Sequence, residues 1–210
     1  MRPGSSAMGA ETLSRAAAAE GVLPELRAAT RTQHDRIERL LALEAPMPLA
    51  RYGVILLGFQ RFLTAWEQEL RDALPPRLHG WLAERGRLGF IAQDLAFLGH
   101  DVSGLAGQDV PRCLPERSVA AAFGSLYVIE GSALGGQVIT PRLKRDLGLE
   151  PGRGASYFHG FGDRTGAMWR EFRLLAEHEI GADPARRRAA RDAAEQTFEA
   201  LIATFERLLS

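Results

Sequence analysis

Apolar residues recur at helical spacing along almost the whole chain, and this feature restricts the fold most strongly. Between 24 and 44 they fall on one broad helical face. Similar patterns predict helices over 48–74, 77–85, 90–99, 116–136, 165–180 and 184–209. No segment shows a convincing strand alternation, and Pro141 is expected to end or kink the helix before it. We therefore predict one all-α domain of about seven to nine helices.

Charge and composition exclude several functional classes. The 26 basic residues balance the 26 acidic residues, so no net field favours nucleic acid or an anionic membrane. No apolar run approaches the roughly 20 residues that span a bilayer. Residues 1–22 are expected to form a flexible tail without a secretory signal, followed by one domain over 23–210. Cys113 is the only cysteine, which excludes an intrachain disulfide and fits a cytoplasmic protein.

The first predicted helix has the most informative group of polar residues. At about 100° per residue, Arg27, Arg31, His34 and Glu38 fall in one narrow sector beside the apolar face. His34 is therefore placed to point into a pocket and bind a metal, and Glu38 lies one turn later, where it can fix the imidazole tautomer. The alternative is an ordinary amphipathic helix in which a boundary histidine has an acidic neighbour at i+4.

Glycines mark the helix predicted over 116–136. Gly124, Gly131 and Gly135 share one helical face, and Gly136 lies beside them. Glycine inside a helix costs up to about 1 kcal/mol relative to alanine, so this face indicates that something approaches the backbone closely. A flat cofactor and a second helix packed through small residues both satisfy that requirement. A phosphate-binding loop does not, because no strand precedes the glycines and no GK[ST] follows.

The remaining candidates carry weaker signals. The other histidines show no paired ligand spacing, namely His79, His100, His159 and His178. Phe198 and Phe205 are spaced for one face of the last helix, as core-filling aromatics usually are. The arginines at 186–188 are most simply a solvated helix start.

Two segments, LRAATRTQHDRIE and LYVIEGSALGGQVI, together resemble the heme oxygenase family, above all its bacterial biliverdin-producing members. The likeness covers about 23–209. It implies a single-domain helical bundle with heme b between a proximal N-terminal helix and a kinked, glycine-rich distal helix. By this resemblance His34 is the iron ligand, Glu38 is the acidic residue one turn later, and Arg27 and Arg31 face the heme propionates.

The resemblance also assigns the distal side. Gly131, Gly135 and Gly136 match the glycines of the distal helix. Ser132 stands where mammalian-type members carry an aspartate that organises water, an acid that some bacterial relatives also lack. Phe198 is similar to an aromatic residue that lines the heme pocket, and Arg170 loosely matches a further basic residue near the propionates.

The activity implied by the resemblance is oxidative cleavage of heme to biliverdin, with release of ferrous iron and carbon monoxide. It uses O₂ and electrons from an external reductase or ferredoxin-type donor, because the chain has no flavin or nicotinamide motif. A biliverdin-binding photoreceptor is one acceptor of the product. A non-catalytic heme carrier or sensor is the alternative, and Ser132 keeps it open. A different enzyme on the same architecture, such as a thiamin-degrading or quinone-cofactor-forming relative, would be favoured by failure to bind heme.

Overall fold

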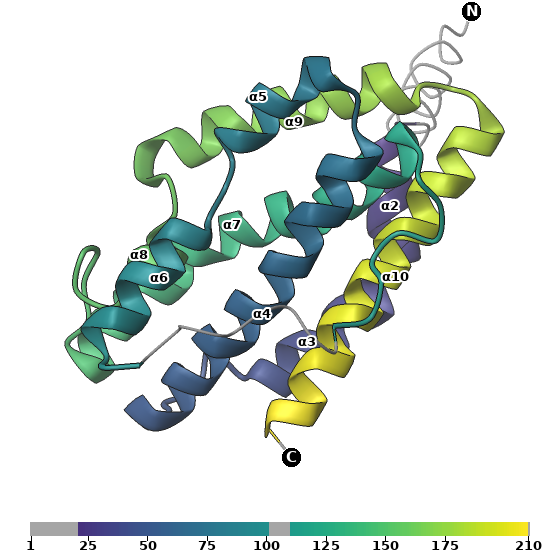
Figure 1. Cartoon of the computed structure of the whole chain (residues 1–210). Helices are drawn as coiled ribbons and strands as arrows, with labels where there is room; N and C mark the ends of the chain where they lie inside the picture. The colour runs from purple at the N-terminus through teal and green to yellow at the C-terminus, as the bar shows by residue number, and fades with distance from the viewer. Residues whose placement is uncertain (1–20, 101–109, 210) are drawn as a thin grey trace, which may run out of the picture.

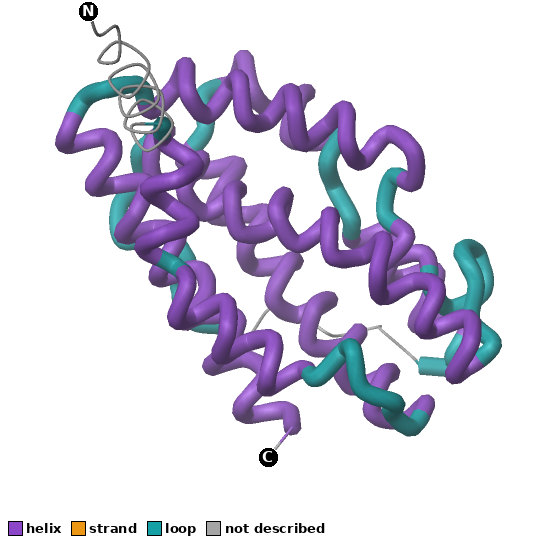
Figure 2. Tube along the Cα trace, turned by 180° about the vertical axis from the view of Figure 1, so that it is seen from behind, coloured by secondary structure: helices purple, strands orange, loops and turns teal. Residues whose placement is uncertain are grey.

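The computed structural model describes residues 21–100 and 110–209, and within them the chain is almost entirely helical (Figure 1). The helices are α2 (Val22–Ala29), α3 (Arg31–Leu41), α4 (Leu49–Ala73), α5 (Pro76–Ala83), α6 (Leu88–Phe97), α7 (Val119–Leu147), α8 (Ser156–His159), α9 (Thr165–Ile180) and α10 (Pro184–Leu209), with a short 3₁₀ turn at Gly162–Arg164. Figure 2 shows helices joined by loops and no strand in this part of the chain. The predicted all-α fold is confirmed.

The long helix α10 organises the bundle. It packs against α7, α4 and the N-terminal pair α2 and α3, while α9 and α8 also pack against α7 (Figure 1). Its start is set locally, because Asp183 Oδ1 accepts the amide hydrogens of Ala185 at 2.8 Å and Arg186 at 3.1 Å. The predicted bounds of α9 and α10 are confirmed, and α4 lies one residue inside its predicted bounds at each end.

Two helices differ from the sequence prediction. The segment expected to form one helix over 24–44 is divided into α2 and α3 at Thr30, where φ is −96° and ψ is 5°. The Thr30 hydroxyl donates to the Leu26 carbonyl at 2.8 Å, which is a common way for threonine to bend a helix. Helix α7 passes through Pro141 and ends only at Gly148, where φ is +68°. Burial of Leu143 beyond the proline favours continuation despite the lost amide hydrogen bond.

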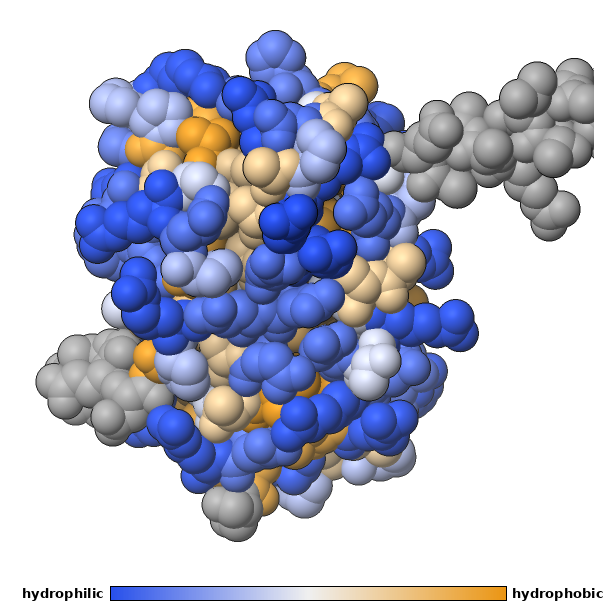
Figure 3. All heavy atoms as spheres, turned by 90° about the vertical axis from the view of Figure 1, so that its right-hand side faces the viewer, coloured by the Kyte–Doolittle hydropathy of each residue, from blue (hydrophilic) through white to orange (hydrophobic). Residues whose placement is uncertain are grey.

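Helix α7 also corrects an expectation about apolar runs. By length and composition alone it could cross a membrane, which the sequence analysis did not anticipate. However, 61% of its most apolar window is buried inside the protein, as in a core helix. Figure 3 shows one face of the molecule, where hydrophilic side chains cover most of the surface and apolar ones appear in small patches.

Candidate functional site

His34 lies on α3 with its imidazole accessible and oriented. Its Nδ1 is 3.5 Å from Glu38 Oε2, and the side chains of the two residues are 56% and 66% exposed. The ring also contacts Phe198 of α10 edge-on, with centroids 6.0 Å apart and planes at 73°. Phe198 itself is buried. The structure therefore brings together three residues singled out from the sequence, and it leaves Nε2 without a partner in the described part of the chain.

An alternative use of the same residues must be considered. His34, Asp35 and Glu38 offer ligand atoms that all lie within 4.8 Å of one another, close enough to surround a cation. All three side chains are exposed, and neighbouring acidic groups on a helix surface commonly hold no ion. Neither Asp35 nor Glu38 is buried beside His34 as a closed metal cage would require, so the geometry favours an imidazole that binds a ligand from outside.

The predicted basic residues occupy exposed positions. Arg27 and Arg31 have no carboxylate partner among residues 21–100 and 110–209, although Arg36 on the same helix pair is bonded to Glu199 and Glu206 at 3.2 and 2.6 Å. Two guanidinium groups, one on α2 and one on α3 with His34, thus remain available to an anionic ligand. Arg170 on α9 is also exposed, and its guanidinium lies over Gly166 one turn earlier. No hydrogen bond or ion pair joins Arg170 to the described residues of α2 and α3.

Tyr127 links the two predicted halves of the site, and the sequence analysis missed it. It lies on α7, where burial raises the pKa of its phenol while hydrogen bonding to Thr30 and the charge of Arg27 lower it. Helix α7 therefore meets the bend between α2 and α3 at this point. One turn beyond Thr30 lies His34, and one turn beyond Tyr127 lies Gly131. Figure 1 shows α3 and α7 leading away from this joint in different directions.

The glycines of α7 divide into two pairs. A Cβ on Gly124 would collide with the Ala190 backbone of α10, and a Cβ on Gly136 would collide with the Phe158 carbonyl. These two glycines are explained by close packing of the chain. Among residues 21–100 and 110–209, a Cβ on Gly135 would meet no atom within 4 Å, and one on Gly131 would meet only the Trp169 indole, at 3.9 Å. Packing explains neither Gly131 nor Gly135, so their backbone is open to a ligand.

Apolar side chains surround the open pair. Leu134 and Val138 are 37% and 51% exposed, which is unusual on a helix whose first half is buried. Ser132 lies beside them, and its hydroxyl donates to the Ile129 carbonyl at 2.8 Å. With its proton committed to the backbone, the hydroxyl can still accept a hydrogen bond from water. This surface, made of Gly131, Ser132, Leu134, Gly135 and Val138, is called the open face below.

A buried ion-pair network lies next to the open face and was also missed. Glu130 precedes Gly131 on α7 and is only 5% exposed. Its carboxylate accepts hydrogen bonds from Arg85 at 2.6 Å and from Arg87 at 3.3 Å. The sequence signal was a glutamate inside an apolar stretch, flanked by isoleucine and glycine, because such a charge is rarely buried without a partner.

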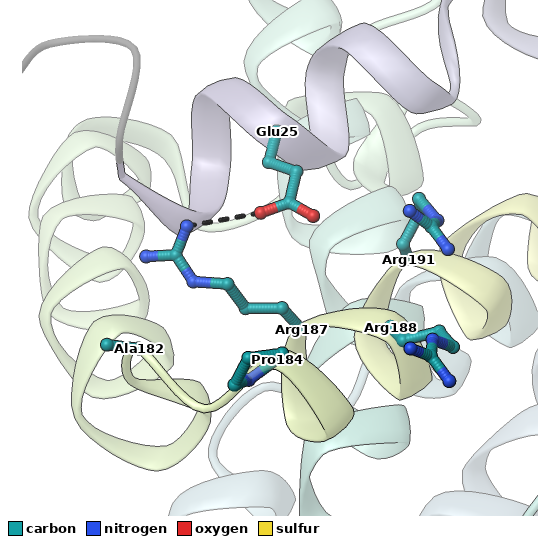
Figure 4. Close-up of a pocket in the computed structure, with 6 residues that line it drawn as sticks. All are labelled: Glu25, Ala182, Pro184, Arg187, Arg188 and Arg191. Atoms are coloured by element: carbon teal, nitrogen blue, oxygen red, sulfur yellow. Dashed lines mark hydrogen bonds and ion pairs between the residues drawn. The ribbon is translucent and has the colours of Figure 1, made fainter. Parts of the chain in front are cut away.

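Two hollows of the surface lie elsewhere. One of about 510 Å³ is lined by Glu25 of α2, by Ala182, and by four residues of α10, Pro184, Arg187, Arg188 and Arg191 (Figure 4). Arg187 pairs with Glu25 at 3.2 Å across it. Another, of about 340 Å³, lies at the C-terminal part of α7 beside Glu150. Neither includes His34 or the open face, so neither of these two hollows is the candidate site.

Comparison with known proteins gives concordant matches. The family model described as heme oxygenase matches residues 21–207. A protein named heme oxygenase from Xanthomonas campestris pv. campestris (strain 8004) is 35% identical over 136 residues, which are 64% of this chain and 77% of that protein. The crystal structure of NO- and CO-bound heme oxygenase from Neisseria meningitidis superposes with a TM-score of 0.71 and 22% identity, covering 90% of this chain and 92% of the other. The structure of heme oxygenase from Leptospira interrogans gives a TM-score of 0.68 and 18% identity, covering 89% and 99%. At these identities, the two structural matches establish the fold alone.

Proposed function

This chain belongs to the heme oxygenase family and is an enzyme of heme degradation, and from that premise we propose which of its residues bind heme and direct the reaction. The reaction is the oxidative cleavage of heme to biliverdin, with release of ferrous iron and carbon monoxide. Heme b, the proposed form, is at once substrate and cofactor. Bound heme supplies the iron at which O₂ is reduced and the meso carbon that is attacked.

The residues of the site suit a flat, apolar ligand that carries two carboxylates. The observation that supports this proposal most is the pair Gly131 and Gly135. A Cβ at either position would collide with no described residue, while Gly124 and Gly136 are covered by the chain itself. Leu134 and Val138 add apolar surface to the same face. Arg27 and Arg31 add cations that have no carboxylate partner in the described chain. A porphyrin ring with propionates uses all of these features.

On the proximal side, His34 Nε2 is the proposed iron ligand. The Glu38 carboxylate near Nδ1 favours a proton on that nitrogen and leaves the Nε2 lone pair free to bind iron. Phe198 limits rotation of the imidazole through its edge contact. Arg27 and Arg31 pair with the propionates and thereby set the in-plane orientation of the ring. We also assign Arg170 to the propionate side, supported only by its exposed position on α9.

On the distal side, the open face lets the backbone of α7 come close to the ring. Gly131 and Gly135 leave room for a diatomic ligand, while Leu134 and Val138 exclude bulk water. Ser132 accepts a hydrogen bond from an ordered water, because its own proton is held by Ile129. Gly136 acts indirectly. Because it has no side chain, α7 can pack directly against the Phe158 carbonyl, which sets the distance of α7 from the heme plane.

Electrons and product acceptors come from outside the chain in this proposal. A reductase or ferredoxin-type protein would deliver electrons for O₂ reduction, and a biliverdin-binding photoreceptor is one acceptor of the product. We propose a cytoplasmic location, which a single cysteine that is buried and unpaired supports.

Heme titration followed by turnover tests the proposed function. Hemin added to the protein should give a Soret band typical of histidine ligation at one heme per chain. Ascorbate under air should then yield biliverdin, which chromatography detects. Stable heme without turnover would instead indicate a carrier or sensor.

Replacement of His34 tests the iron ligand. The His34→Ala variant should lose the histidine-ligated spectrum and turnover, and added imidazole should restore both in part. His178→Ala is the matched control, because His178 is an exposed histidine on another helix, α9. A His34→Ala protein with the parental spectrum and rate would contradict the assignment.

Replacement of Arg27 and Arg31 tests the propionate contacts. Each bond between charged groups contributes about 1.5 kcal/mol or more, so the double alanine variant should bind heme at least about 100-fold more weakly. Arg39→Ala is the control, since Arg39 is an exposed arginine of α3, the helix that also carries Arg31. Unaltered affinity together with an unaltered mixture of biliverdin isomers would show that the two arginines are merely solvated.

A further inference from the structure

A buried arginine joins the two helices that meet beside the open face. The Arg85 side chain follows α5 and is only 3% exposed. One guanidinium nitrogen donates to Glu130 of α7 at 2.6 Å. The other donates to the Met168 carbonyl of α9 at 3.2 Å and to the Glu171 carboxylate at 2.7 Å. Arg85 therefore binds α7 immediately before Gly131, and it binds α9 on both sides of position 169.

The cross-link is itself held firmly. The Arg85 guanidinium stacks over Trp81, with its carbon 4.2 Å from the ring centroid. Arg87 donates to the second Glu130 oxygen at 3.3 Å, so both oxygens of this buried carboxylate are engaged. Burying such charges costs desolvation energy that apolar side chains of similar size would avoid. A gain in stability alone therefore explains this network poorly, whereas the fixed geometry that it imposes on α7 and α9 is a specific property.

The cross-link sets the spacing between Gly131 and Trp169. In the part of the chain that the structure describes, the Trp169 indole is the one group close to the Cβ position of Gly131, at 3.9 Å. It packs between Tyr127 and Phe172, with centroid distances of 6.3 and 5.3 Å. Trp169 thus borders one side of the open face. Arg85 bonds to Glu130, which precedes Gly131, and to Met168, which precedes Trp169, and so links the two positions.

We propose that Arg85 is a positioning residue that fixes Trp169 relative to Gly131, and that this spacing restricts how heme sits on the open face and so which meso carbon is oxidised. Arg85 itself is buried behind α7 and does not contact the substrate. The inference rests on the proposed function. Its physical basis is steric. If the Trp169 side chain moves by a fraction of an ångström, the in-plane rotation allowed to a heme held at its iron by His34 changes.

A second arginine provides a matched control. Arg77 also joins α5 to α9, through two hydrogen bonds to Glu179 at 2.7 and 2.8 Å. Its side chain is 57% exposed, and neither partner is adjacent to Gly131 or Trp169. Arg77→Ala therefore removes an α5–α9 contact without touching α7. If Arg85 served only to hold α5 against α9, the two arginines would be interchangeable in their effects on the site.

Two Arg85 variants separate positioning from folding. Arg85→Lys keeps the charge but cannot bind Glu130, Met168 and Glu171 in one plane. The double variant Arg85→Met/Glu130→Leu removes both buried charges and so leaves no unpaired carboxylate in the core. Arg87 keeps Glu67 as a neighbouring acid in that variant. Both variants and Arg77→Ala are first checked for a parental circular dichroism spectrum.

Hydrogen exchange in the heme-free protein gives the first readout. Amides at 131–136 and 168–172 should exchange about tenfold faster in both Arg85 variants than in Arg77→Ala. The variants lack the cross-link, so local opening of these segments no longer has to break it. The second readout is the biliverdin isomer ratio after turnover with ascorbate in air. The minor-isomer fraction should rise about twofold or more in the Arg85 variants and stay parental in Arg77→Ala.

The outcomes separate the two proposals. Faster exchange with an unaltered isomer ratio would reduce Arg85 to a structural role and overturn the inference, as would parental values of both. If an Arg85 variant binds heme without turnover, the C–O stretching band of its carbon monoxide complex decides. A shifted or broadened band supports the inference, and a parental band contradicts it.

A parental protein that never forms biliverdin would contradict the proposed function, and with it the claim about the meso carbon. Exchange would still show whether Arg85 couples α7 to α9.

Discussion

The two halves of α7 use the same residue type for opposite purposes. Residues 119–130 are almost wholly buried, and Gly124 lets the backbone of α10 approach at Ala190. In 131–147 only Gly136 and Leu143 are buried. A Cβ on Gly135 would meet no described residue, and one on Gly131 would only touch the Trp169 indole. Gly124, Gly131 and Gly135 nevertheless share one helical face. A glycine face therefore does not distinguish a packing surface from a ligand surface, because the difference depends on where α10 crosses α7.

The largest effect is expected in the packed half. In Gly124→Ala the new methyl group overlaps backbone, which cannot turn aside as a side chain can, so α10 must move. We expect the free energy of unfolding to fall by about 3 kcal/mol, the upper part of the range for overpacking. Urea denaturation followed by circular dichroism measures this. A variant as stable as the parent would break the comparison, because Gly124 would then not be a packing residue.

A smaller loss of stability is expected at Gly136. The Phe158 carbonyl that its Cβ would meet belongs to α8, a helix of only four residues that a loop can carry aside. We expect Gly136→Ala to lower the free energy of unfolding by about 1–2 kcal/mol, measured as for Gly124→Ala. A loss larger than that of Gly124→Ala would show that α8, rather than α10, is the rigid neighbour of α7.

Substitution in the open half should affect the reaction and spare the fold. A Cβ at position 135 would meet no described residue within 4 Å, so in Gly135→Leu the denaturation midpoint should stay near the parental value. Heme should still bind through His34, yet biliverdin formation in a single turnover with ascorbate should fall at least about tenfold, because the side chain occupies the space for O₂. A parental rate would mean that the open face does not lie over the heme.

Gly135→Ala sharpens the comparison further. At an exposed helix position alanine is favoured over glycine, so the heme-free protein should gain about 0.5–1 kcal/mol. The change in the free energy of unfolding thus has the opposite sign to that of Gly124→Ala, although both variants carry the same substitution on the same helical face. Thermal or urea denaturation of the two variants side by side checks this. Destabilisation by both would indicate that a part of the chain covers Gly135.

The smallest effect is expected at Ser132. Because its hydroxyl proton is held by the Ile129 carbonyl, Ser132→Ala removes at most one acceptor for water. Single-turnover biliverdin formation should fall by less than about threefold, which corresponds to under 1 kcal/mol. If Ser132→Ala were more damaging than Gly135→Leu, the hydroxyl would have the role of the aspartate that this position lacks.

Much of the helical framework could be predicted from the sequence, because its signals are local. Asp183 and Pro184 start α10, the Pro75–Pro76 pair ends α4, and apolar periodicity marks the helices between. The prediction was wrong where a distant contact competed with a local signal. Helix α7 continues through Pro141, and the first predicted helix bends at Thr30, where Tyr127 of α7 packs against it.

The sequence by itself determined the family, most of the helical framework and the placement of Glu38 one turn after His34, since motif and spacing are properties of short segments. The contact of Phe198 with His34 joins α10 to α3, and only the tertiary structure shows it. Only the tertiary structure decided which glycines of α7 are open and which are packed. Their neighbours, Ala190 and Phe158, lie far along the chain. It alone also joined Glu130 to Arg85, which lies 45 positions earlier. Burial and ion pairing arise between segments that meet only on folding, so no local pattern encodes them.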